Sequence, residues 1–118
     1  MSYRISNTTR QTVISARAQR ADSFFSRMKG LLGRESLLPG EGLIITRCKS
    51  IHMLFMKFPI DVLFVSKEDC IVGFVEQIQP YQLSPHFFSA AYAIELPVGQ
   101  IKASQSQKKD KIRIEALS

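Results

Sequence analysis

The sequence places a cysteine, a histidine and a methionine at intervals of four residues, at Cys48, His52 and Met56. A thiolate, an imidazole and a thioether together suit a soft metal ion such as copper(I) or zinc. In a strand, however, Cys48 and His52 lie about 13 Å apart at ~3.3 Å per residue, and one metal with bonds of ~2.0–2.3 Å cannot reach both. A shared site requires a bend between Lys49 and Ile51. We therefore expect no metal or cofactor, and Met56 in the core.

The same distance opposes a thiolate–imidazolium pair of Cys48 and His52 for nucleophilic catalysis. A second imidazole, His86, is an alternative partner, because catalytic pairs need only be neighbours in space. The other cysteine, Cys70, stands in no Cys-x-x-Cys motif. We expect both thiols to be free, as is usual in a reducing compartment.

Two carboxylates, Asp61 and Glu95, stand between apolar neighbours. A buried carboxylate requires hydrogen bonds or a cation, so we expect a structural role for Asp61, with a ligand-facing or general-base role as the alternative. If both carboxylates faced one pocket, they could perform acid–base chemistry or hold a hard metal. We favour instead a Glu95 that faces solvent or pairs across a sheet.

The elements that must position these residues are mostly short strands. Pro59 cannot donate to a central ladder, so it divides the apolar run 51–65 into two extended pieces. Alternating or continuous apolar runs predict strands, and one i, i+4, i+7 pattern predicts a short helix. The strands are expected at 12–18, 43–45, 92–96 and 111–116 and in a hairpin of 62–65 with 70–75, and the helix at 22–32. The pattern predicts a mainly β fold, a compact β-sandwich or partly open barrel with a short helix.

Composition supports a single globular domain. The chain has 118 residues with 45% hydrophobic and 22% charged residues, and we expect one domain over 1–118 with an ordered core of about 12–116. The polar, basic start predicts no secretory signal, and no apolar run approaches the ~20 residues of a spanning helix. We therefore expect a cytoplasmic protein without a membrane partner.

The net charge of +6 comes largely from the first 34 residues, where Asp22 is the only acid. Such an excess permits binding to a polyanion through phosphate contacts. The bases are spread singly, however, and no aromatic-plus-basic recognition motif accompanies them. We favour a solvated basic surface over a nucleic-acid partner.

Four pieces of the sequence, in this order, resemble domain-of-unknown-function family 192, also called uncharacterised protein family 0127. They are Arg27–Arg34 (RMKGLLGR), Gly42–Leu43, Ile51–Phe64 (IHMLFMKFPIDVLF) and Glu95–Gly99 (ELPVG). The resemblance spans about residues 12–115, and the central block is its specific part. It implies a β-rich single-domain fold, found in bacteria and archaea, with no established biochemical activity; we expect a bacterial protein.

The resemblance also implies partners for Asp61. It places Arg27 and Arg34 in the family's Arg-x-x-Gly-Leu-x-x-Arg motif, so we expect them to pair with Asp61 and to tie the helix to the central strand. The sequence departs from the family pattern at two turns, Asp69-Cys70 in place of Asp-Gly and Lys109-Asp110 in place of Gly-Asp. These departures put hairpin geometry in question more than function.

Three functional hypotheses follow, and none is a demonstrated catalytic activity. We favour a small binding or accessory domain that holds a small molecule or a protein partner near the strand 53–58. The second is a hydrolase or metal-assisted enzyme built from Asp61, Glu95, His52 and Cys48. The third is a polyanion-binding module that uses the basic N-terminal third.

Overall fold

A computed structural model of the chain describes residues 1–22, 34–53 and 56–117. Within these ranges the chain forms seven strands and one short helix, so the expected mainly β class is confirmed. The helix expected at 22–32 and Arg27 lie outside the described residues, apart from Asp22. The elements are β1 (Ser2–Asn7), β2 (Thr12–Ala21), β3 (Glu41–Thr46), β4 (Ile60–Val65), β5 (Ile71–Ile78), β6 (Tyr92–Leu96), α2 (Gln100–Ala103) and β7 (Ile112–Leu117).

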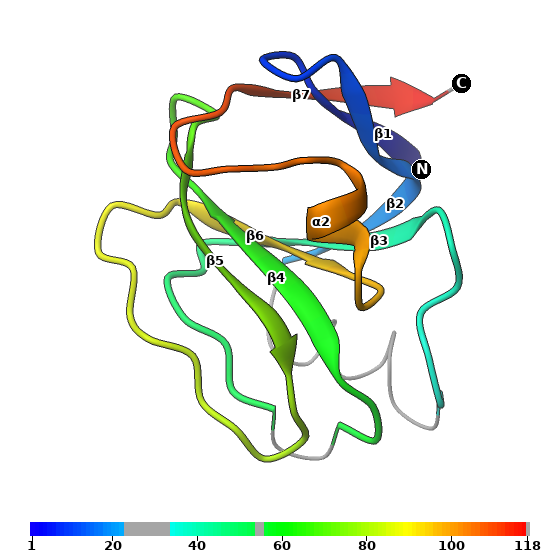
Figure 1. The fold of residues 1–118 in the computed structure, drawn as a ribbon, viewed down its shortest axis with the longest axis vertical. Helices are drawn as coiled ribbons and strands as arrows, with labels where there is room; N and C mark the ends of the chain where they lie inside the picture. The colour runs from blue at the N-terminus through cyan, green and yellow to red at the C-terminus, as the bar shows by residue number, and fades with distance from the viewer. Residues whose placement is uncertain (23–33, 54–55, 118) are drawn as a thin grey trace.

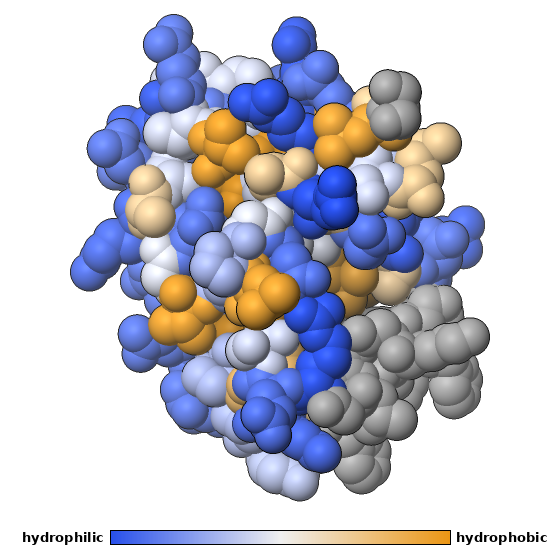
Figure 2. All heavy atoms as spheres, turned by 90° about the vertical axis from the view of Figure 1, so that its right-hand side faces the viewer, coloured by the Kyte–Doolittle hydropathy of each residue, from blue (hydrophilic) through white to orange (hydrophobic). Residues whose placement is uncertain are grey.

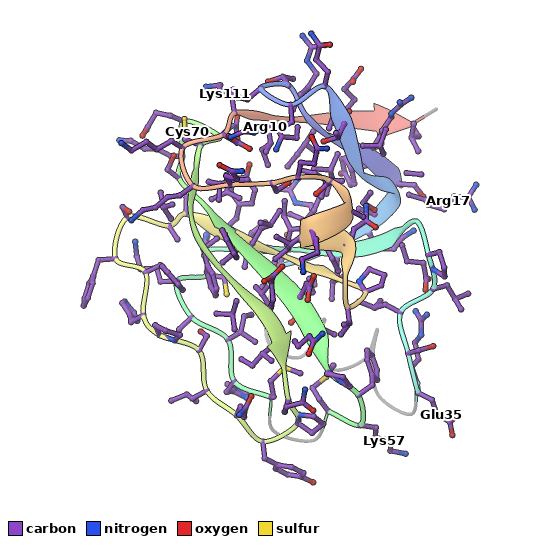
Figure 3. The ribbon with its side chains drawn as sticks, in the orientation of Figure 1. Arg10, Arg17, Glu35, Lys57, Cys70 and Lys111 are labelled. Carbon is purple, nitrogen blue, oxygen red and sulfur yellow. The ribbon has the colours of Figure 1, made fainter. Side chains whose placement is uncertain are left out.

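The strands form one curled mixed sheet in the order β5-β4-β6-β3-β2-β1-β7. β2 and β3 are parallel, whereas the other neighbours are antiparallel. The edge strands β5 and β7 approach each other at one end, where Cys70 and Lys111 form a bridge and the Ile71 N–H donates to the Asp110 carbonyl at 2.9 Å. Figure 3 shows Cys70 and Lys111 together there. The sheet is not closed into a barrel, so the partly open alternative describes it best.

The curl has a core on each face. The inner core lies inside the curl and gathers residues from nearly every strand together with Ile101 of α2, which lies across the sheet in Figure 1. The outer core lies between the other face of β3, β4 and β6 and the loops that cover it. Because both faces of β4 are covered, all its residues are buried, which explains its continuous apolar run.

Two segments cover the outer core and hydrogen-bond to each other, residues 49–53 and 81–87. The Met53 N–H donates to the Gln82 carbonyl at 2.9 Å, and the Phe87 N–H donates to the Lys49 carbonyl at 2.8 Å. The piece before Pro59 was expected to be extended. Among its described residues, which exclude 54 and 55, it pairs with this loop through a single His52–Leu83 bridge and not with the sheet.

Gly73 of β5 can pack against the covering segment 81–87 because it has no side chain. A Cβ built on Gly73 would lie 2.2 Å from the Phe87 ring, which stacks on Phe64 with centroids 4.3 Å apart. We predict that Gly73→Ala displaces Phe87 and lowers the free energy of unfolding by about 1–3 kcal/mol, the usual cost of overpacking. Chemical denaturation measures this cost. A smaller cost of Gly73→Ala in a Phe87→Leu background is expected, and an equal cost would contradict the clash.

Two turns where the sequence departs from the family pattern form nonetheless. Asp69 and Lys109 adopt the left-handed conformation, with φ of 65° and 80°. The β4–β5 turn is closed by the Ser66 N–H, which donates to the Cys70 carbonyl at 2.9 Å. Hairpin geometry is therefore kept, with two non-glycine residues in a conformation that favours glycine.

The surface in Figure 2 shows hydrophobic side chains in several small patches with hydrophilic ones between them. Small separate patches of this kind are normal on a globular surface. Among the described residues, no helix has the length and hydropathy needed to cross a membrane.

Candidate functional site

Asp61 is fully buried, and its partners are backbone groups. Its Oδ1 accepts from the Gln77 N–H at 2.9 Å, and its Oδ2 accepts from the N–H groups of Gly99 and Ile101 at 3.1 Å each. It thereby fixes the start of α2 and a left-handed residue of β5 (Gln77, φ 53°) to β4. The structural role was expected, but the partners were not, because these three donors come from two distant segments.

Arg34 does not pair with Asp61. Its Nη2 donates to Glu41 Oε1 at 2.5 Å, and the Leu38 N–H donates to the same oxygen at 2.6 Å. The hydrogen bond from Arg34 holds the pKa of Glu41 below its usual value, outweighing the effect of burial. The pairing expected for Arg34 is therefore wrong, and the pairing expected for Arg27 lies outside the described residues.

Glu95 is also fully buried, so the expectation of a solvent-facing side chain is wrong. In the β4–β6 register Val62 lies opposite Glu95, and Asp61 lies opposite Leu96. Val62 belongs to the outer core and Leu96 to the inner core. Since side chains alternate across a sheet, Asp61 and Glu95 point to opposite faces and form no carboxylate pair.

Cys48 and Met56 are buried in the outer core, as expected for Met56. Cys48 donates from Sγ to the Ser50 carbonyl at 3.1 Å, and neither cysteine forms a disulfide. His52 is half-buried and lies in the bridge to Leu83. In the ranges that the structure describes, no three histidine, cysteine or acidic side chains gather to hold a metal ion.

In the described part of the N-terminal third, the basic side chains are dispersed and partly neutralised. Arg10 pairs with the buried Asp110 at 3.0 Å, and Arg20 pairs with the exposed Asp22 at 3.4 Å. Arg17 points away from the sheet into solvent in Figure 3. These positions favour a solvated basic surface.

The structure instead brings nine residues to one hollow of about 350 Å³, which we call the amphipathic hollow. They come from β1, β2, β3, β6 and β7, from the positions after β3 and before β6, and from the β4–β5 turn. It lies at the Tyr92 end of β6, whereas α2 lies at the Leu96 end. Ile44 in its apolar lining belongs to the inner core. Its other large apolar residues are partly buried and pack against that core: Tyr3, Tyr92 and Ile114. The nine residues are Tyr3, Ile44, Thr46, Ala91, Tyr92 and Ile114, with Arg20 and Arg47 as the cations and Asp69 as the one carboxylate.

One wall of the amphipathic hollow is fixed by Tyr92, whose hydroxyl donates to Asp69 Oδ1 at 2.7 Å. Burial, aided by the adjacent Asp69 carboxylate, raises the pKa of Tyr92, so its hydroxyl keeps its proton. Arg20 and Arg47 are exposed at the opening. The arrangement can bury an apolar group and attract an anionic one.

Sequence reasoning missed this hollow. Its lining comes from strands far apart in the chain, which become neighbours only through the strand order. Asp69 was noticed only as a turn residue. No spacing within one segment signals such a site.

Proteins of known sequence or structure resemble this chain over most of its length. A UPF0127 protein of Thermococcus sibiricus is 33% identical over 114 residues, covering 90% of this chain and 71% of the relative. A UPF0127 protein of Pyrococcus abyssi is 32% identical over 114 residues, with coverage of 92% and 94%. Both are archaeal, so they do not support the expectation of a bacterial source.

A crystal structure of a protein of unknown function from Novosphingobium aromaticivorans is similar with a TM-score of 0.79. It is 21% identical, with coverage of 96% of this chain and 84% of that chain, so the likeness concerns the fold. The sequence model of domain-of-unknown-function family 192 matches residues 5–114 of this chain. The chain therefore belongs to domain-of-unknown-function family 192, described as Uncharacterized ACR, and its relatives have no established activity.

Proposed function

We propose that this protein is a small-molecule-binding domain and that its ligand occupies the amphipathic hollow. The observation that carries the proposal is the lining of that hollow, which joins a buried apolar floor to two exposed cations. Its one carboxylate, Asp69, is already engaged by the Tyr92 hydroxyl. Its volume of about 350 Å³ lies in the range of small-molecule sites. The ligand class that fits is a small molecule with an apolar body and one anionic group.

The apolar floor of the hollow and its charged opening contribute to binding in different ways. Ile44 is 5% exposed and cannot move without disturbing the inner core, so the floor is preformed. Arg20 shares only an exposed ion pair with Asp22, and such pairs contribute little to stability. Its guanidinium is therefore available to an incoming carboxylate, sulfonate or phosphate.

Anilinonaphthalene sulfonate is a suitable probe, because it joins an aromatic body to a sulfonate. We predict saturable binding of about one molecule per chain at neutral pH, and about a fivefold weaker affinity in Arg20→Ala, since a charge-assisted hydrogen bond is lost. Isothermal titration calorimetry measures both.

The matched control is Arg113→Ala, which removes the same charge from an exposed position on β7. Side chains alternate along a strand, so Arg113 points away from the face on which Ile114 lines the hollow. The affinity should therefore stay within about twofold of the parent. Equal losses in the two variants would show a general charge effect, and a parent that does not saturate would contradict the proposal.

A cytoplasmic location is part of this proposal. Neither Cys48 nor Cys70 forms a disulfide. Cysteines stay reduced in the cytoplasm, and this supports a cytoplasmic location.

A further inference from the structure

A second hollow, of about 810 Å³, opens beside the amphipathic hollow; we call it the cationic cleft. Residues 47–50 after β3, the β4–β5 turn and the loop 79–91 contribute to it. The residues that matter are Arg47, Cys48, Lys49, Lys67, Glu68 and His86. The two hollows share Arg47 and Ala91.

The cleft carries an excess of positive charge. Arg47, Lys49 and Lys67 line it against the single carboxylate of Glu68. Arg47 and Lys67 are exposed, and neither forms an ion pair with any residue that the structure describes. Cations that converge from separate segments without acidic partners are suited to a phosphate group.

Lys49 differs from Arg47 and Lys67, because its ammonium group already donates hydrogen bonds within the protein. Its Nζ donates to the carbonyls of Phe88 and Ala90 at 2.7 and 2.8 Å. It thereby holds the loop 86–90 against the cleft while it keeps its charge near the opening. The shape of the cleft is therefore fixed before a ligand arrives.

An aromatic platform stands at the edge of the cleft. His86 lines the cleft, and its ring lies against the ring of Phe88, with centroids 4.4 Å apart and planes tilted by 57°. Phe88 is 81% exposed, whereas phenylalanine side chains are more often buried. Exposed aromatic rings beside a positive groove offer stacking to planar bases.

We propose that the cationic cleft binds a nucleotide, or another small phosphate ester that carries a planar ring. Lys67 and Arg47 contact the phosphate, and the ring stacks on Phe88. Recognition needs both parts, because the phosphate site is exposed and each charged contact is weakened by water. This site shares Arg47 with the amphipathic hollow, but Lys67 and Phe88 do not line that hollow, so the proposal does not depend on the function proposed for it.

Adenosine diphosphate is the probe, with adenosine and inorganic phosphate as its two halves. Calorimetry at low salt should show saturable binding of adenosine diphosphate, with affinity at least about tenfold higher than that of either half, and weaker binding as salt rises. Lys67→Ala and Phe88→Ala should each weaken binding about fivefold or more, because one removes a phosphate contact and the other the stacking surface.

The chain offers a matched control for each variant. Lys108→Ala removes an exposed lysine outside the cleft, and Leu83→Ala removes an exposed apolar side chain that does not line it. Both should bind adenosine diphosphate like the parent. Equal losses in the controls, or no saturable binding by the parent, would overturn the proposal. Phosphate binding as tightly as adenosine diphosphate, with Phe88→Ala unchanged, would also overturn it and indicate a bare anion site.

The two proposed sites can fail independently. Arg20→Ala should leave adenosine diphosphate binding unchanged, because Arg20 lines only the amphipathic hollow. Lys67→Ala should leave anilinonaphthalene sulfonate binding unchanged, because Lys67 lines the cationic cleft and not the amphipathic hollow. Loss of both ligands in either variant would contradict the separation of the sites.

Discussion

Asp61→Asn is expected to lower the free energy of unfolding by about 2–3 kcal/mol, because it leaves a buried donor without an acceptor. The Asp61 carboxylate accepts from three backbone N–H groups with two oxygens. An amide keeps one oxygen and replaces the other with an NH₂ group, which can only donate. In either orientation at least one N–H of Gln77, Gly99 or Ile101 then faces another donor.

Chemical denaturation at neutral pH measures this loss. Asp22→Asn is the control, because the Asp22 side chain is 77% exposed, and its stability should stay within about 0.5 kcal/mol of the parent. Since α2 lies at the other end of β6 from the amphipathic hollow, probe binding by folded Asp61→Asn should be unchanged. Equal stability of Asp61→Asn and the parent at every pH between about 3 and 8 would contradict the structural role.

Asp110→Ala is expected to cost about 3 kcal/mol at neutral pH, because it dismantles a buried cluster of hydrogen bonds. Asp110 is 2% exposed, and its Oδ2 accepts from Asn7 Nδ2, Arg10 Nε and the Gln107 N–H at 2.9–3.0 Å. These bonds fasten the β1–β2 turn to the segment before β7. Without the carboxylate, Asn7 Nδ2 keeps only the Ser106 hydroxyl as an acceptor among the described residues, and Arg10 loses its ion pair.

The contribution of Asp110 should depend on pH. Burial by itself raises the pKa of Asp110, but the hydrogen bonds from Arg10, Asn7 and Gln107 outweigh it, so the pKa lies below the ordinary 3.8. The folded state therefore holds this proton less tightly than the unfolded state. The stabilisation is complete above the ordinary pKa and is lost as pH falls through the folded pKa.

Unfolding free energies of the parent and Asp110→Ala, measured from about pH 7 to about pH 2, test this sign. The difference between them should narrow as the pH falls below about 4. Asp22→Ala, in which an exposed carboxylate is removed, should show no comparable change. A difference that is constant over the whole range would contradict the proposed role of the Asp110 charge.

The sequence predicted those parts of the fold that depend on local patterns. The strand at Tyr92–Leu96, ended by Pro97, and the hairpin around residues 66–69 were both found where expected. Burial of Asp61 also followed from its apolar neighbours. These features are readable because each is determined by residues close together in the chain.

Features that depend on tertiary contacts could not be predicted in this way. The strand Ser2–Asn7 has a polar, weakly alternating sequence and is held between β2 and β7. The helix Gln100–Ala103 has four residues and is fixed by Asp61, about forty residues earlier. The separation of Asp61 from Glu95 required the register of β4 on β6.

The candidate sites were the least predictable part. Both hollows are assembled from side chains of segments that are distant in sequence, and Arg47 is the residue at which they meet. The soft-ligand series Cys48, His52 and Met56 attracted attention by its spacing, yet Cys48 and Met56 serve as packing residues in the outer core.

The central claim is that the amphipathic hollow binds a small molecule with an apolar body and an anionic group. Its most direct test is an NMR titration of isotope-labelled protein with anilinonaphthalene sulfonate. We predict saturable shifts of the backbone amides at Ile44, Arg47 and Tyr92, with those at Gln77 and Ile101 unchanged. Shifts that fail to saturate, or that are largest at Gln77 and Ile101, would contradict the claim.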